Sequence, residues 1–165
     1  MFQTWIFPLL NANVDTQLMK IVSIVLILTI VAVGYYIFAS LTARKPPIGL
    51  VDGKLRPCPR KQNCVKSEEE IKNFVAPFRT PGLSWQEIRN AVQQTGGEIK
   101  QHEQNYLFAE YKSAVFRFVD DLEIRFDEET ETYHVRSGSR SGTKDFGVNR
   151  KRVEEIRQVL SQTRP

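Results

Sequence analysis

The apolar and polar residues divide the chain into an N-terminal hydrophobic run and a longer segment of mixed pattern. Residues 21–41 contain no charged side chain. As a helix, which rises about 1.5 Å per residue, this run spans about 32 Å and matches the roughly 30 Å hydrocarbon core of a membrane. Lys20 precedes the run, and Arg44 and Lys45 follow it. The pattern therefore predicts one transmembrane helix over residues 21–41.

Residues 1–20 precede this helix as an N-terminal extension. The beginning of the extension is apolar and aromatic but is interrupted by Pro8, so it favours either an interfacial or a disordered segment. The sequence at Met19 also resembles the start of a secretory signal, which makes it an alternative to Met1 as the first residue. Because no small-residue cleavage site is evident near residues 39–43, we interpret the apolar run as an uncleaved anchor.

Residues 42–50, which include Pro46 and Pro47, predict a short stiff linker to a globular domain over residues 51–165. In that domain, Ser84 to Glu87 is a capping box. Apolar residues at helical spacing follow the box and are ended by two glycines, which predicts a helix over residues 84–96.

The pattern then changes to alternation, which predicts strands near residues 98–103, 105–112, 114–126 and 132–138. In the third of these, apolar and charged residues alternate, so we expect one buried and one solvent-exposed face. The phase changes at Asp120 and Asp121, which indicates a bulge, a bend or a turn.

A last amphipathic helix follows Gly147, with Asn149 as its predicted N-cap and Val153, Ile156 and Leu160 on one face. The fold class that we predict is α+β. An antiparallel sheet of about four strands carries two main helices on one face and is preceded by the transmembrane helix.

Residues 135–152 combine glycines, small polar residues and arginines between the last strand and the last helix. Backbone N–H groups near glycines, a helix N-terminus and guanidinium groups are all suited to binding an anion. Three consecutive cations, residues 150–152, also oppose the helix dipole and require either carboxylates or a bound anion. The candidate ligand-binding residues are Arg136, Ser137, Ser139, Arg140, Asn149 and Arg150.

Carboxylates are concentrated in residues 120–131 and suggest three roles: a calcium site, acid–base chemistry or internal ion pairs. Neighbouring residues on a strand face opposite sides, so Asp120 and Asp121 cannot both line one pocket unless the backbone bends. We therefore favour ion pairs, in which one of these aspartates contacts Arg136, Arg140 or Arg150. Asp145 supports the cations of the last helix.

Composition and spacing restrict the classes of function. All but one of the 23 basic and all but one of the 19 acidic residues follow the apolar run, and this near balance argues against a general nucleic-acid-binding protein. A hydrolase or transferase that uses Asp120, Asp121 or Glu110 with arginine clamps is the alternative to a binding module. The isolated His102 and His134 indicate no Ser–His or Cys–His pair, and we expect no metal and no cofactor.

The two cysteines, Cys58 and Cys64, bear on the side of the membrane. Their spacing permits a disulfide in an oxidising compartment, whereas two reduced buried thiols or metal ligands are the alternatives. The cations that follow the apolar run, among them Arg44 and Lys45, instead favour a cytoplasmic domain under the positive-inside rule.

An ordered set of short motifs resembles the family called domain of unknown function 1499 (DUF1499), over about residues 48–158. The motifs are Pro57, Cys58 and Pro59; Asn63, Cys64, Val65 and Ser67; Tyr106, Glu110 and Ser113; residues 118–121; Val135, Arg136 and Ser137; Ser139, Arg140 and Gly142; and residues 145–152. Lys66, Gly138, Thr143 and Lys144 depart from the family's pattern.

The resemblance implies no established activity, but it implies a protein that is exported or attached to a membrane. It favours a disulfide between Cys58 and Cys64 and an extracytoplasmic (periplasmic) domain on a single-pass anchor, with the cytoplasmic face as the alternative. The expected partners are the membrane and an anionic lipid, glycan or envelope protein.

Overall fold

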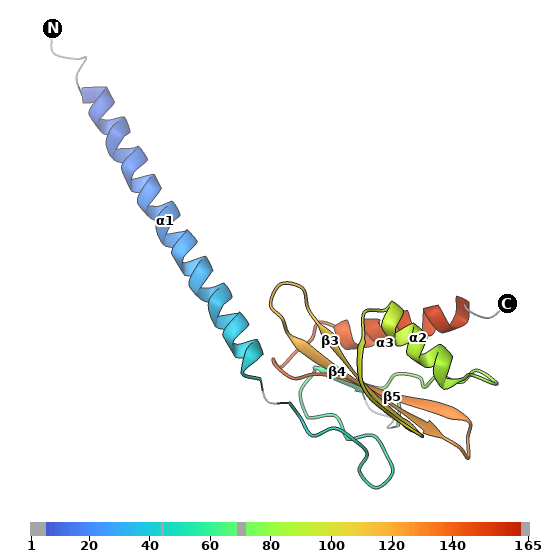
Figure 1. Cartoon of the computed structure of the whole chain (residues 1–165). Coiled ribbons are helices and arrows are strands. Elements are labelled where there is room, and N and C mark those ends of the chain that lie inside the picture. The colour runs from blue at the N-terminus through green and yellow to red at the C-terminus, as the bar shows by residue number, and fades with distance from the viewer. Residues whose placement is uncertain (1–5, 44, 69–71, 163–165) are drawn as a thin grey trace. The chain divides into compact units, whose positions relative to one another are not determined.

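Helix α1 runs from Ile6 to Leu41 in the computed structural model, which describes residues 6–43, 45–68 and 72–162 (Figure 1). Its segment Asp15–Leu41 is 27 residues long and, by length and composition, is apolar enough to cross a membrane. A membrane anchor and a signal sequence both fit this description. The helix begins inside the predicted extension, whose residues 1–5 lie outside the described part of the chain. Residues 1–39 and 40–165 form separate units.

The second unit is built on a five-stranded antiparallel sheet in the order β1-β5-β4-β3-β2. Its strands are β1 (Cys64–Lys66), β2 (Glu98–Glu103), β3 (Tyr106–Lys112), β4 (Val119–Asp127) and β5 (Thr132–Ser139). The predicted α+β class is confirmed, with one strand more than expected. The additional strand, β1, has three residues that are all buried, so it is too short and too uniform to show a period of two.

The predicted strand over residues 114–126 begins only at Val119. Residues 113–118 form the connection from β3 to β4, closed by a hydrogen bond from the Ser113 backbone N–H to the Phe118 carbonyl (2.9 Å). Arg117 has a positive φ of 57° there. The phase change at the two aspartates therefore marks the boundary between a loop and a strand, because the aromatic residues before it do not belong to the sheet.

Two helices, α2 (Trp85–Gln94) and α3 (Val148–Gln162), cover one face of the sheet (Figure 1). The predicted capping box of α2 is confirmed: Ser84 Oγ accepts from the Glu87 N–H, and the Glu87 carboxylate accepts from the Ser84 N–H. Apolar side chains of both helices pack against the sheet, with Ile88, Leu122 and Ile156 fully buried.

Asp145, not Asn149, caps α3, so the predicted N-cap was wrong. The Asp145 carboxylate accepts from the backbone N–H groups of Gly147 (3.1 Å) and Asn149 (3.0 Å). Burial opposes ionisation of Asp145, but these hydrogen bonds lower its pKa below the ordinary value.

The other face of the sheet is covered by residues 45–62, here called the strap (Figure 1). Leu55 of the strap is buried against Tyr106 and Phe108, and Ile48 packs beside them. A disulfide between Cys58 and Cys64 joins the strap to β1. The strap thus converts the second face of the sheet into an interior.

Candidate functional site

Charged side chains dominate the face under the strap. Register places Arg136 between Lys66 on β1 and Glu123 on β4. Lys66 is 3% exposed, Asp121 2% and Glu123 1%. The prediction of a solvent-exposed second face was therefore wrong, because a segment without periodic pattern covers it.

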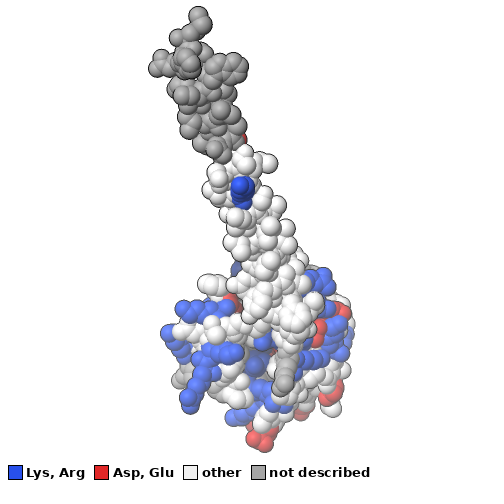
Figure 2. Space-filling view, turned by 90° about the vertical axis from the view of Figure 1, so that its left-hand side faces the viewer, with Lys and Arg blue, Asp and Glu red and all other residues white. Residues whose placement is uncertain are grey.

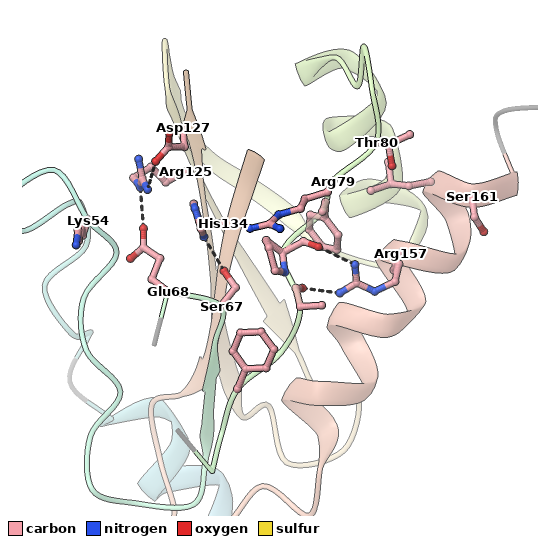
Figure 3. Close-up of a pocket in the computed structure, with 15 residues that line it drawn as sticks. Lys54, Ser67, Glu68, Arg79, Thr80, Arg125, Asp127, His134, Arg157 and Ser161 are labelled. Carbon is pink, nitrogen blue, oxygen red and sulfur yellow. Dashed lines mark hydrogen bonds and ion pairs between the residues drawn. The ribbon is translucent and has the colours of Figure 1, made fainter. Parts of the chain in front are cut away.

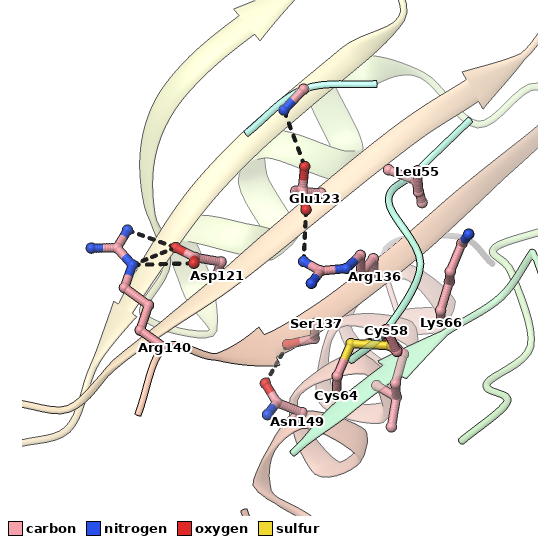
Figure 4. Close-up of polar contacts among 12 residues, drawn as sticks. Leu55, Cys58, Cys64, Lys66, Asp121, Glu123, Arg136, Ser137, Arg140 and Asn149 are labelled. Atoms are coloured by element: carbon pink, nitrogen blue, oxygen red, sulfur yellow. Dashed lines mark hydrogen bonds and ion pairs between the residues drawn. A yellow bond between two sulfur atoms is a disulfide. The ribbon is translucent and has the colours of Figure 1, made fainter. Parts of the chain in front are cut away.

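Glu123 is the centre of one buried hydrogen-bond network (Figure 4). Arg136 Nη1 donates to Glu123 Oε2 (2.8 Å), and the Tyr106 hydroxyl donates to Oε1 (2.7 Å). The Gly49 N–H of the strap reaches the same carboxylate oxygen at 3.3 Å. Burial and the Glu123 charge raise the pKa of Tyr106, which keeps its hydroxyl a donor. Arg136 Nε is buried without a hydrogen-bond partner among the described residues.

Arg140 is held by two carboxylates. Its Nε lies 3.0 Å and its Nη2 lies 2.6 Å from Asp121 Oδ1 (Figure 4). The same Nη2 lies 2.5 Å from Glu110 Oε1. Burial raises the pKa of Asp121, and Arg140 offsets only part of that effect. Burial acts in the same direction on Glu110, but there the hydrogen bond from Arg140 leaves the pKa lowered. One of the predicted pairings between the aspartates and the arginines is thus present, between Asp121 and Arg140.

Asn149 is the centre of a second network, between the sheet and α3. Its Oδ1 accepts from Ser137 Oγ (2.7 Å) and Arg152 Nη1 (2.6 Å), and its Nδ2 donates to Ser139 Oγ (3.0 Å). Arg152 Nη2 also donates to Asp120 Oδ2 (2.6 Å). Arg152 was not among the predicted ligand-binding residues, because its position among three consecutive cations gives no sign that it alone is buried.

The structure therefore distributes the six predicted ligand-binding residues over three places. Arg136 and Arg140 lie under the strap, Arg150 is exposed on α3, and Ser137, Ser139 and Asn149 belong to the network beside the helix. Arg136, Ser139 and Arg140 line one small cavity of about 180 Å³. Asp120 and Asp121 face opposite sides of the sheet and bind different arginines.

A larger cavity of about 850 Å³ lies at the end of the sheet that carries the turn from β4 to β5 (Figure 3). Its walls combine cations, carboxylates and apolar side chains. They are formed by Lys54, Ser67, Glu68, Phe74, Ala76, Pro77, Phe78, Arg79, Thr80, Arg125, Asp127, His134, Arg157, Leu160 and Ser161. Its volume is in the range of small-molecule sites, and none of the predicted ligand-binding residues lines it.

Two residues of this cavity form a contact that no local pattern of the chain predicts. Ser67 Oγ lies 3.2 Å from His134 Nδ1 and accepts a hydrogen bond from the Val135 N–H (2.8 Å), so its own proton can point to the histidine (Figure 3). Burial lowers the pKa of His134, which favours the neutral ring. The expectation that the chain has no Ser–His pair was wrong, because the two residues are 67 positions apart.

Comparison with known proteins supports the resemblance seen in the motifs. The family described as "Protein of unknown function (DUF1499)" matches residues 54–160, which include the disulfide, the side chains of both networks and all residues of the large cavity except Ser161. The comparison with curated proteins gives no match. The chain therefore belongs to the DUF1499 family.

Proposed function

We propose that this chain is a single-pass membrane protein whose extracytoplasmic domain binds an amphiphilic anion in the large cavity. The proposal replaces the predicted ligand site, because Arg136 and Arg140 are already neutralised by Glu123, Asp121 and Glu110. It keeps the predicted class of ligand and assigns it to another end of the domain.

The disulfide supports the extracytoplasmic side. Disulfides persist in oxidising compartments and are rare in the cytosol. The cations after α1 favour the opposite side, but the positive-inside rule applies to short loops, and large domains are translocated largely regardless of their charge. A domain of more than a hundred residues with a Cys58–Cys64 bond therefore fits the extracytoplasmic side better.

The charges around the cavity support an anionic ligand. Arg125 is neutralised by Glu68 (2.7 Å) and Asp127 (2.9 Å). Lys54 and Arg79, in contrast, have no ion-pair partner within the described part of the chain, and both are exposed at the cavity. Such cations remain available to a carboxylate or phosphate.

The apolar part of the wall supports an amphiphile over a simple ion. Phe74 is 39% exposed although it belongs to the wall, and Phe78, Pro77 and Leu160 lie beside it. Arg157 contributes its guanidinium carbon 5.0 Å from the centre of the Phe78 ring. Unpaired cations next to an apolar wall are the observation that carries the proposal.

Native mass spectrometry of the full chain in detergent, with oleate as the anionic probe and glyceryl monooleate as the neutral one, tests it. We expect oleate adducts, and we expect Lys54→Ala with Arg79→Ala to weaken oleate binding roughly tenfold or more, since charged hydrogen bonds are lost. The matched control, Arg89→Ala with Lys100→Ala, removes the same charge from α2 and β2, outside the lining of the cavity. Equal oleate binding by both double variants, or preference for the neutral probe, would contradict the proposal.

A hydrolase is the second candidate, and the contact between Ser67 and His134 is the observation that favours it. A neutral histidine beside a serine hydroxyl is the arrangement used for nucleophilic catalysis. The competing role of Ser67 is structural, because its oxygen accepts the Val135 N–H in place of a strand carbonyl. Hydrolysis of p-nitrophenyl butyrate that disappears in Ser67→Ala, at unchanged thermal stability, would favour the hydrolase over the binding module.

A further inference from the structure

One end of the sheet gathers two loops that are far apart in sequence. The β3–β4 connection, residues 113–118, leaves the sheet where Lys112 pairs with Val119. β5 ends beside it, since Asp120 pairs with Ser139 and the Arg140 N–H donates to the Val119 carbonyl (3.1 Å). The loop into α3 and the first turn of that helix continue from there. Residues 113–118 and 140–151 are here called the basic end.

Large apolar side chains are exposed at the basic end. Phe146 is 95% exposed, Val115 67% and Val148 48%. Phe146 also has a positive φ of 52°, a conformation that a bulky side chain rarely adopts. A strained backbone that presents an aromatic ring to solvent gains no packing inside the domain, which indicates that the ring has an external partner.

The charges of the basic end are cationic. Arg117, Lys144, Arg150 and Lys151 are exposed, while the carboxylate of Asp145 is occupied in capping α3. Figure 2, which views the left-hand side of Figure 1, shows more Lys and Arg than Asp and Glu on the domain. The β4–β5 turn at the opposite end of the sheet exposes Glu128, Glu129 and Glu131, and the large cavity beside it adds the cations Lys54 and Arg79. The basic end is therefore apolar and cationic, whereas the opposite end mixes charges of both signs.

The connection to α1 reaches the domain near the basic end. Lys45 Nζ lies 3.8 Å from Glu110 Oε1, and Pro46 lines the small cavity with Arg140. Lys45 is only four positions from Leu41, the last residue of α1. An extended chain of that length reaches at most about 14 Å. If α1 crosses a bilayer, the basic end cannot lie far from the surface of that bilayer.

We propose that the basic end docks on the surface of a membrane that contains anionic lipid. Phe146 and Val115 enter the interface between head groups and acyl chains, and the four cations contact lipid phosphates. This inference rests on the membrane anchor of the proposed function, but not on the ligand in the large cavity. It orients the domain so that the large cavity and the acidic turn point away from the bilayer.

A fluorescent reporter on the full chain tests the docking. The only two cysteines of the chain are joined to each other, so Val115→Cys provides a single thiol for an environment-sensitive NBD label. The labelled chain is reconstituted in vesicles of phosphatidylcholine alone or of equal parts phosphatidylcholine and phosphatidylglycerol. We expect a blue shift and a gain in emission in the anionic vesicles, both reversed by high salt because screening weakens the attraction. The matched label at Glu129→Cys, in the acidic turn, is expected to show neither.

Two variants separate the contributions to docking. Asparagine tolerates a positive φ, so Phe146→Asn removes the aromatic ring without changing the backbone. We expect this variant to lose most of the blue shift at position 115. Lys144→Glu with Arg150→Glu is expected to abolish the difference between the two lipid compositions. An emission spectrum at position 115 that is the same in both vesicles, or the same as at position 129, would overturn the docking.

Flotation of the vesicles after alkaline carbonate distinguishes this failure from failure of the anchor. A chain that floats but shows no shift retains the anchor and lacks the docking. A chain that does not float lacks the anchor, and with it the constraint that holds the basic end near the bilayer.

Discussion

The two faces of the sheet bury neighbouring residues of β4 in opposite ways. Leu122 and Ile124 pack against apolar side chains of α2 and α3. Asp121 and Glu123, which alternate with them, are buried just as deeply under the strap but are held by arginines. The apolar face derives its stability from contact area, whereas the charged face depends on the presence of every partner.

Burial and apolarity are therefore separate properties of a strand. A buried ion pair adds little net stability relative to an apolar pair of the same shape, because desolvation of both charges opposes their attraction. Loss of one partner is costly, since it leaves an isolated charge in the interior. On the charged face, replacing one partner of an ion pair is therefore expected to destabilise the domain more than replacing both partners. No such difference is expected on the apolar face.

The largest expected effect comes from Glu123→Ala. It leaves Arg136 without its carboxylate and the Tyr106 hydroxyl without its acceptor, so we expect a loss of about 3–5 kcal/mol in the free energy of unfolding. Urea unfolding of the full chain in detergent measures it. Glu129→Ala, an exposed glutamate six positions away, is the control and is expected to change stability by less than about 0.5 kcal/mol.

The double variant Glu123→Leu with Arg136→Met separates the loss of one charge from the loss of the pair. It removes both charges together and is expected to be far less destabilising than Glu123→Ala. If the double variant is as unstable as the single one, the native side chains stabilise this face by their packing and not by their charges. The two faces of the sheet would then not differ in the way described.

On the apolar face, Leu122→Ala is expected to cost about 3 kcal/mol. The cause is the loss of buried apolar area and the cavity that remains. Because no unpaired charge is left behind, a second substitution on a neighbouring strand is not expected to restore stability, in contrast to the removal of both charges on the other face. Urea unfolding of the single variant, and of its combination with Val135→Leu, checks this expectation.

Removal of the disulfide by Cys58→Ala with Cys64→Ala has a smaller expected effect of about 2 kcal/mol, because the bond closes a short loop. Its effect is also expected to be local. Amide hydrogen exchange should accelerate in residues 46–60, which cover the charged face, and remain unchanged in α2 and α3. Uniform acceleration across the domain would show that the strap and the helices unfold as one unit.

The smallest expected effect concerns pH at the edge of the charged face. The hydrogen bond from Arg125 lowers the pKa of Asp127 to about 2, from an ordinary value of 3.8. A lowered carboxyl pKa stabilises the fold above the unfolded pKa, and this contribution is lost as pH falls through about 2. Since Asp127 is partly exposed, we expect its contribution to the free energy of unfolding to fall by only about 1 kcal/mol between about pH 5 and pH 2. This fall is expected to be absent in Asp127→Asn. Asp121, whose pKa burial raises, contributes with the opposite sign.

Much of the fold was predictable because its signals are local. The capping box at Ser84 fixed the start of α2, and alternation in β4 identified which residues face the helices. The burial of Glu123 and Asp121 was not predictable, because it depends on a strap without periodic pattern. Asn149 was selected as a cap because its side chain suits that role, yet the same hydrogen-bonding capacity places it in the buried network.

The candidate site was predictable only in part. The arginines of residues 135–152 were correctly identified as unusual, but which carboxylates neutralise them depends on strand register, as for Arg136 and Glu123. The large cavity combines residues from the strap, β4, β5 and α3, so no single segment carries its signal. The pair of Ser67 and His134 likewise arises only from the pairing of β1 with β5.

The position of β1 has a consequence for the order in which the domain assembles. β1 pairs only with β5 in the sheet, and Asn63 beside it donates to the Ser139 carbonyl, 76 residues away. The cysteines, by contrast, are only six positions apart. In a chain that emerges from its N-terminus, the disulfide ring can close while β5 is still being delivered, and contacts of such long range form late. The strap and its disulfide ring can then form before the sheet face that they cover. β5, the last strand, completes the sheet when it pairs with β1.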